Sequence, residues 1–497
     1  METTHFQLKL PALRGVLLVL LAAVVLVFSF VSISKVGFAV ILIMLLLLWV
    51  VTFYIEGVYQ AADIPVLFLV LGTFTWGRAF SLLGINVANL PLYVTEIVLA
   101  VSLGLLFLER KSLKKLGNEW RLPLPKGLAA VLAAYFLLGI LHLVLGVMGN
   151  GFPALRDIVF CLYLLFLFIT LSLLGNPARI KKLMPVMMLA VIFLLFTALI
   201  IFFTYLPDSS FRGFIKEIKM TNLGLYCGLI VMFGFSFYTF FKKKTRLLMG
   251  IFTYLGFLFV VMAEVRAAWA GMLVSLILLG ILLKKEFKIF ILIFLLVLAS
   301  IFIIDYFGLG VQKDKLASVA EQLKSVTQRR HQDTMPAANI KWRLGIWRQT
   351  IDEIKEYPIF GWGYGTQIDY EIWTKNLSWL KAIGANTGIL PPHNHVLAIT
   401  YKMGLVGLVL FLFINFRVFF YGLFYIKKCK SGFNRRFLIA SLAGLVYWHG
   451  MAFFFDVLES PPTGIFLWIL LGCILGVVYV DRNLKEETTK DKKFTEK

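Results

Sequence analysis

The chain has 497 residues, of which 60% are hydrophobic and 15% charged, and its mean hydropathy is +0.87. Soluble proteins carry about a quarter charged residues, so this composition excludes an ordinary soluble domain. The apolar runs are long enough for helices, whereas a β-barrel would show short alternating segments. The composition therefore predicts an all-α polytopic membrane protein.

The net charge of +22 lies mostly in short loops between apolar runs. That distribution is typical of membrane topology, so we expect the lipid bilayer as a partner and no nucleic acid. The cysteines lack metal-ligand spacing, and we expect them to be free thiols that pack as small apolar residues. They are Cys161, Cys227, Cys429 and Cys473.

Hydropathy predicts about twelve to fourteen transmembrane spans, each judged against the roughly 20 residues that a crossing helix needs. We expect the first to be a membrane helix and not a signal peptide, because no small-residue cleavage site follows it. The run 395–425 is longer than a crossing needs, and we expect its first turn or two to lie outside the core or the run to bend near Gly404 and Gly407. The candidate spans cover residues 13–32, 36–55, 64–84, 91–108, 127–148, 157–174, 183–204, 222–241, 247–264, 267–283, 288–307, 395–425, 437–455 and 463–480.

The strongly basic loops all fall on one face of this layout, together with both termini, and the positive-inside rule makes that face cytoplasmic. We therefore expect transmembrane helices 1–11 over residues 1–307, an extracytoplasmic domain over 308–392, helices 12–14 over 393–480 and a disordered cytoplasmic tail over 481–497. The basic loops are residues 109–126, 178–182, 242–246, 284–288 and 427–436.

The extracytoplasmic segment is too long for a passive connector. Residues 311–333 are polar and helix-compatible and are expected to lie along the membrane surface or against the domain. Residues 342–357 predict an amphipathic helix with Ile346 and Thr350 on its apolar stripe, beside Leu344, Trp347 and Ile351. Pro358 ends the helix, and the glycines of 361–365 predict a tight turn that lets the backbone approach another segment closely.

Several arginines lie at the outer ends of spans. Arg266 follows Glu264, with which it could pair, and Arg343 and Arg348 lie on the amphipathic helix. Arg156 starts another span. The alternatives are an arginine that reaches lipid headgroups at 266, a solvated helix face at 348 and a simple anchor at 156.

His393 follows two prolines, which favour an extended approach to a helix that starts near the histidine. A histidine at a helix start tends to stay neutral and can serve as a base. Asn394 and His395 follow, and His395 is expected to face away from His393. A zinc site is disfavoured because the spacing is short and no third ligand lies nearby.

Arginines suit a diphosphate because their planar donors bind oxygens in pairs. A histidine suits the removal of a proton from a hydroxyl group. Together these groups indicate attack by a sugar hydroxyl on a glycan linked to a lipid through diphosphate, with the arginines taking up charge on the leaving group.

Three segments then resemble the superfamily of O-antigen ligases and polymerases of the bacterial envelope. They are "VRAAWAGML" around Arg266, "RLGIWRQTIDEIKEYPIFGWGYGT" from Arg343 to Thr366, and "PHNHVLAITYKMGLVGLVLF" from Pro392 to Phe411. The order of the segments, on either side of one large outer loop between the eleventh and twelfth predicted spans, makes the resemblance specific.

The resemblance implies a GT-C-like fold and a metal-independent, inverting glycosyltransferase without cofactors, in the cytoplasmic (inner) membrane of a bacterium with its site facing outward. It implies His393 as catalytic base and Arg266, Arg343 and Arg156 as ligands of the diphosphate. Arg348, Asn394, His395 and Glu264 are possible supporting residues.

The substrates implied are a polyprenyl-diphosphate-linked glycan and an acceptor glycan or glycolipid, with flippase and chain-length regulator proteins as further partners. We favour a polymerase of O-antigen, capsule or exopolysaccharide repeat units over a ligase that transfers polymer to lipid A-core or to a related wall or protein acceptor. A multi-span transporter is a distant alternative. It would carry ionisable residues at mid-membrane and inverted repeats, whereas the ionisable residues of this sequence cluster at the outer edge.

Overall fold

The computed structural model describes two compact units, which are treated separately. The first includes residues 1–122, 169–197 and 205–219, and the second includes 123–168, 198–204 and 220–497. The residues described are 63–76, 80, 84–87, 90–115, 124–174, scattered positions between 179 and 195, 220–263, 265–284, 287–306, 335–368, 392–455, 458 and 460–495. The first two predicted spans and the expected surface segment 311–333 lie outside them.

In the first unit, helices α3 (Asp63–Trp76) and α5 (Val94–Lys115) flank an antiparallel hairpin of β1 (Gly84–Val87) and β2 (Leu90–Tyr93). Gly84 pairs with Tyr93, and Val87 with Leu90. This hairpin departs from the all-α prediction, because Pro91 cannot continue a helical ladder and the flanking Ile, Val and Tyr favour strands.

An ion pair ties together two segments of this unit that were both predicted to be cytoplasmic. Arg179 Nη1 lies 3.3 Å from Asp63 Oδ2 and also donates a hydrogen bond to the Ser172 carbonyl at 3.0 Å. The Asp63 side chain is fully buried, so the guanidinium compensates a carboxylate that burial would otherwise destabilise.

Five helical segments among the described residues are long and apolar enough to cross a membrane. They are Leu128–Asn150, Ala154–Leu173, Lys243–Met262, His395–Lys428 and Thr463–Asn483. Shorter apolar helices cover Asp63–Phe74, Val94–Leu108, Leu223–Phe237, Arg266–Leu282 and Lys288–Ser300. The mostly helical membrane architecture expected from the composition is therefore confirmed at this coarse level.

The helices of the second unit follow the predicted spans closely. Two of them, α13 (Lys243–Met262) and α14 (Arg266–Leu282), are separate helices despite their very short join. The others are α6 (Leu128–Asn150), α7 (Ala154–Asp157), α8 (Val159–Leu162), α9 (Leu165–Leu173, which runs into the first unit), α12 (Met220–Phe237), α15 (Phe287–Tyr306), α17 (Met335–Glu356), α20 (His395–Tyr425), the 3-10 turn η2 (Ile426–Lys428), α21 (Gly432–Ala452) and α22 (Pro461–Thr495).

The charged tail is not disordered as predicted, since α22 continues through it to Thr495. The reason is that residues after 481 are rich in Lys and Glu, which have good helix propensity, and they extend a helix that has already been nucleated in the membrane segment.

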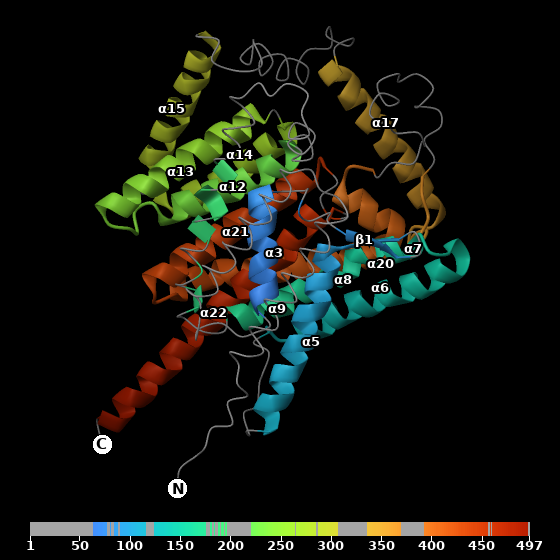
Figure 1. The fold of residues 1–497 in the computed structure, drawn as a ribbon, viewed down its shortest axis with the longest axis horizontal. Helices are drawn as coiled ribbons and strands as arrows, with labels where there is room; N and C mark the ends of the chain where they lie inside the picture. The colour runs from blue at the N-terminus through green and yellow to red at the C-terminus, as the bar shows by residue number, and fades with distance from the viewer. Residues whose placement is uncertain are drawn as a thin grey trace. The chain divides into compact units, whose positions relative to one another are not determined.

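Helices α14 and α21 pack against each other within the group of α12, α13, α14 and α21 (Figure 1). A Cβ on Gly450 would lie 2.6 Å from the Gly271 Cα, so only glycines permit this approach. Small residues are the usual means of close packing between membrane helices. The contact places the start of α14 beside the end of α21.

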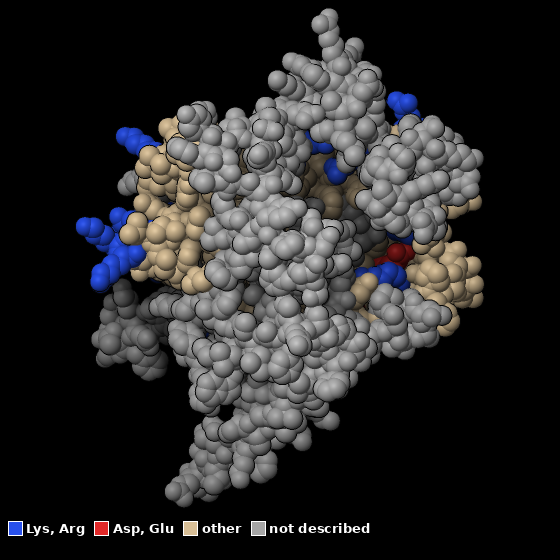
Figure 2. Space-filling view, turned by 45° about the horizontal axis from the view of Figure 1, so that its top comes forward, with Lys and Arg blue, Asp and Glu red and all other residues tan. Residues whose placement is uncertain are grey.

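The opposite ends of these helices gather segments predicted to be cytoplasmic. Phe240, after α12, packs against Phe433 at the start of α21 with ring centroids 5.7 Å apart. Asp481 of α22 accepts hydrogen bonds from the backbone N–H groups of Lys430 and Ser431, each at 3.3 Å. The three segments therefore share one end of the helices of the second unit. Figure 2 shows one group of Lys and Arg side chains at its left edge and others toward its right side.

Helix α20 bends at Gly404, where φ is 67° and ψ is −172°, so the bend falls at the first of the two expected glycines. The interruption frees backbone groups on both sides. The loop of residues 357–368, here named the lid loop, satisfies them by four hydrogen bonds: Trp362 N to Tyr401 O (2.7 Å), Gly363 N to Lys402 O (3.1 Å), Leu405 N to Pro358 O (2.8 Å) and Val406 N to Ile359 O (3.2 Å).

The glycines of the lid loop explain how it fits. Gly361, Gly363 and Gly365 all have positive φ, and a Cβ on Gly361 would lie 2.6 Å from both Gly404 N and Tyr401 O. The close backbone approach predicted for this turn is thus confirmed. Helix α17 ends just before Pro358, also as predicted.

The inner face of α17 packs as its periodicity indicated, with Ile346 and Thr350 fully buried. Leu344 and Ile351 do not join this stripe, since they are 55% and 44% exposed. At about 100° per residue, they lie on a different face of the helix from Ile346 and Thr350.

Candidate functional site

The end of α21 is the point at which the predicted site residues come together. Residues Phe453–Phe455, here named the aromatic turn, follow this helix directly. Arg343 Nη1 donates a hydrogen bond to the Phe454 carbonyl at 2.7 Å. The His393 ring lies 5.8 Å from the Phe455 ring, measured between centroids. Arg343 and His393, 50 positions apart in the chain, therefore touch the same short turn.

Arg266 joins them through helix packing. It is the first residue of α14, and the Gly271–Gly450 contact holds that end of α14 next to the end of α21. Burial, together with the positive charge of Arg266, lowers the pKa of Arg343 to about 10. The charge effect shows that the two guanidinium groups are electrostatic neighbours, and the pKa still leaves Arg343 charged at neutral pH.

Two neighbouring guanidinium groups repel each other, and an anion bound close to both relieves that repulsion. Arg343 Nε is buried and has no hydrogen-bond partner among the described residues. The arrangement thus combines two positive charges with unused donor capacity on Arg343, which suits an anion.

Helix α20 starts near His393, as the sequence context suggested, and His393 itself lies just before the N-cap. Asn394 is the N-cap, and its Oδ1 accepts from the N–H groups of Val396 and Leu397 at 2.9 and 3.2 Å. His393 precedes the cap with φ 49°, a left-handed conformation that is uncommon outside glycine. Strained backbone of this kind costs about 1–3 kcal/mol and clusters at functional sites.

Trp347 holds the two chain segments of the cluster together. Its Nε1 donates to the Pro392 carbonyl at 2.8 Å, directly before His393, and its ring packs against Phe453 at 6.0 Å between centroids. Trp347 lies one helical turn after Arg343, so one face of α17 presents both residues to the aromatic turn. Sequence reasoning placed Trp347 near the apolar stripe and did not identify this contact.

The other candidates take different positions. Arg348 is exposed on α17, as the solvated-face alternative held. His395 is only 4% exposed and packs on Trp448 and His449, with ring centroids 5.8 and 5.4 Å away, so it belongs to the helix core. Arg156 is half-buried in α7. Glu264 lies outside the described residues.

Asp157 and Lys402 form a supporting contact that the sequence reasoning missed. Lys402 Nζ lies 2.6 Å from Asp157 Oδ2 and also donates to the Thr366 carbonyl. The same carboxylate oxygen accepts from Gly365 N at 2.7 Å. The signal was present in the sequence, because a lysine inside an apolar run is expensive unless it has a partner.

Tyr364 completes the anchoring of the lid loop. Its side chain is fully buried, its carbonyl accepts from Asn150 Nδ2 at 2.8 Å, and its hydroxyl donates to Met403 Sδ at 3.4 Å. Burial, the largest of several causes, raises the pKa of Tyr364 well above its ordinary value, so the phenol stays neutral. The loop after α17 is thus fixed to α6 and α20.

Residues 250–412 match the family model described as O-antigen ligase. This match covers about a third of the chain and shows its similarity to the O-antigen ligase family. The match includes all three motif segments, with Arg266, Arg343 and His393, and it confirms the superfamily predicted from them. Arg156 lies outside the matched residues. No curated protein matches the chain.

A membrane glycosyltransferase of the O-antigen ligase or polymerase type follows from this match. Its substrates are of the class that such enzymes use, a lipid-linked glycan and an acceptor. Within the second unit, the cluster of Arg266, Arg343 and His393 lies at the end of α21 opposite Phe433, where the segments before α21 and after α12 meet.

Proposed function

We propose that the chain polymerises glycan repeat units at the outer face of the cytoplasmic membrane, using a donor linked to undecaprenyl diphosphate. The observation that carries the proposal is the meeting of Arg343 and His393 at the aromatic turn, beside the start of α14 that carries Arg266. Burial, together with the charge of Arg266, lowers the pKa of Arg343. A diphosphate would relieve the repulsion between the two guanidinium groups and use the buried Nε of Arg343.

In the proposed step, the acceptor hydroxyl oxygen attacks the anomeric carbon of the donor sugar from the face opposite the diphosphate. The bond between the anomeric carbon and the diphosphate oxygen breaks, and its electron pair leaves with the polyprenyl diphosphate. His393 removes the proton of the attacking hydroxyl. Inversion at the anomeric carbon follows from the single displacement.

The arginines stabilise the charge that grows on the leaving diphosphate, which is the role that a divalent metal has in many other glycosyl transfers. Both guanidinium groups are positioned by secondary structure, Arg266 by the start of α14 and Arg343 by α17. Preorganised donors need little rearrangement during the reaction, so we propose that the transfer is metal-independent.

Substitution of single residues tests these roles. His393→Ala and Arg343→Ala should each lower transfer at least about 100-fold, because each removes a group that acts in the transition state. Arg348→Ala is the matched control, since Arg348 lies on the same helix but is exposed. Full activity of His393→Ala or Arg343→Ala in protein that inserts normally would refute the assigned roles.

A deletion strain distinguishes the acceptor. Loss of a polymerase leaves single repeat units on the acceptor, whereas loss of a ligase leaves free lipid-linked polymer. Single units are the expected result, and free polymer would overturn the polymerase assignment while keeping the proposed chemistry.

A further inference from the structure

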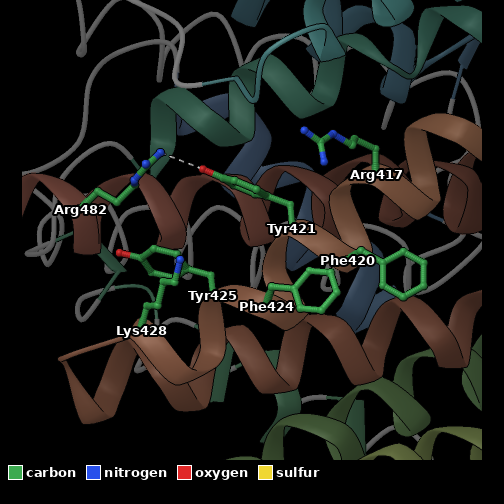
Figure 3. Close-up of a pocket in the computed structure, with 7 residues that line it drawn as sticks. All are labelled: Arg417, Phe420, Tyr421, Phe424, Tyr425, Lys428 and Arg482. Carbon is green, nitrogen blue, oxygen red and sulfur yellow. Dashed lines mark hydrogen bonds between the residues drawn. The ribbon is translucent and has the colours of Figure 1, made fainter.

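A cavity of about 470 Å³ lies at the end of α20 remote from the arginine–histidine cluster (Figure 3). Three cations line it: Arg417 and Lys428 from the α20–η2 segment and Arg482 from α22. Since the cations come from two helices that are distant in sequence, the cavity is a feature of the tertiary structure and not of one basic loop.

Aromatic rings form the rest of the lining. Phe420, Tyr421, Phe424 and Tyr425 follow Arg417 at helical spacings of three and four, and therefore share one face of α20. Phe420 and Phe424 are 44% and 71% exposed. Apolar rings that remain this exposed on a membrane helix are suited to contact with acyl chains.

The polar groups of the cavity are partly preorganised. Arg482 Nη1 donates to the Tyr421 hydroxyl at 3.1 Å, and Figure 3 shows the Arg417 and Arg482 side chains on either side of the Tyr421 ring. The nearest carboxylate in sequence, Asp481, is buried and accepts hydrogen bonds from Lys430 N, Ser431 N and the Tyr425 hydroxyl. No ion pair holds Arg417 within the described part of the chain.

The position of Arg417 within α20 also favours a bound anion. Arg417 precedes Lys428 by three helical turns, about 16 Å along the axis at 1.5 Å per residue. An arginine this far from a helix end is unfavourable in hydrocarbon unless it meets an anion or reaches the headgroup layer. Basic pockets between membrane helices on the cytoplasmic side are typical binding sites for anionic lipid headgroups.

We infer that the cavity binds an anionic glycerophospholipid of the cytoplasmic leaflet, with its phosphate held by Arg482, Lys428 and Arg417 and its acyl chains against Phe420 and Phe424. The inference does not depend on the proposed glycosyl transfer, because the cavity and the arginine–histidine cluster lie at opposite ends of α20. A bound lipid would also fix the depth and tilt of this helix.

The test is native mass spectrometry of the full-length protein in detergent with added phosphatidylglycerol or phosphatidylcholine. The wild type should retain phosphatidylglycerol preferentially. The double variant Arg417→Gln/Arg482→Gln should bind it about 25-fold more weakly, at roughly fivefold for each charge removed. The matched control Lys243→Gln/Lys244→Gln loses the same charge from exposed positions and should bind as the wild type does.

A second variant, Arg417→Lys/Arg482→Lys, keeps both charges and should retain binding, which separates a lost site from a damaged fold. Equal retention of phosphatidylglycerol by the wild type and the Gln double variant would overturn the inference. So would equal weakening in the control variant. Displacement of the lipid by millimolar inorganic phosphate would indicate a site for a soluble anion and would also overturn it.

Discussion

Replacing Gly404 with alanine should detach the lid loop from α20. The glycine has φ 67° and ψ −172°, a region that is essentially restricted to glycine. A Cβ at this position would lie 2.1 Å from the Ile359 carbonyl oxygen and 2.5 Å from Phe360 N. Both are backbone atoms of the lid loop, so no side-chain rotation can relieve the contact.

The size of the effect on docking follows from the hydrogen bonds that hold the lid loop on α20. Four backbone hydrogen bonds join residues 358–363 to residues 401–406. At about 1 kcal/mol each, they stabilise the docked loop by about 4 kcal/mol. In the alanine variant, the strained backbone conformation, about 1–3 kcal/mol, and the contact with the Ile359 carbonyl oxygen oppose docking. Where they cancel the stabilisation, the docked population falls by up to roughly 10³-fold.

Hydrogen exchange is the appropriate assay, because it reports on the amides concerned. In Gly404→Ala, the amides of Trp362, Gly363, Leu405 and Val406 should exchange much faster, and transfer activity should fall because α17 loses the anchor of its C-terminal end. Gly149→Ala is the control, since a Cβ there meets nothing within 4 Å. Wild-type protection of these four amides in Gly404→Ala would refute the reasoning.

Four further predictions concern charge and topology. Lys402→Met should lower the stability of the purified protein by about 3 kcal/mol, because it leaves the Asp157 carboxylate unpaired, and adding Asp157→Asn should restore part of the loss in thermal unfolding. Binding of polyprenyl diphosphate should be constant up to about pH 9 and then fall as Arg343 deprotonates near pH 10. The lowered pKa of Arg343 has the opposite effect on the stability of the free protein. Burying the charged group has its full cost below pH 10, and that cost is relieved above pH 10. Diphosphate affinity that holds to pH 12 would contradict the role assigned to Arg343. Transfer with purified substrate should persist in EDTA, and metal-dependent turnover would contradict the proposed mechanism. A membrane-impermeant maleimide should label a cysteine at Glu356 in intact cells but not one at Lys430, and the reverse pattern would invert the topology.

Much of the local structure could be predicted from the sequence. The separate helices α13 and α14, the end of α17 before Pro358 and the bend of α20 at Gly404 all follow from apolar run length and from the backbone limits of proline and glycine. The helix of the tail was missed because its high charge indicated disorder, and the hairpin was missed because its apolar residues adjoin and overlap two predicted spans.

The sequence alone determined the membrane class of the protein and the residues of its motifs. Lipid forces each crossing segment to satisfy its own backbone, so helices are visible in composition. Which segments meet was decided only by the tertiary structure. The contact of Gly271 with Gly450, the pairing of Lys402 with Asp157 and the approach of Arg343 and His393 to the aromatic turn each join residues far apart in the chain. Such contacts depend on the fit of two distant surfaces, and that fit is a property of the folded bundle that no single segment contains.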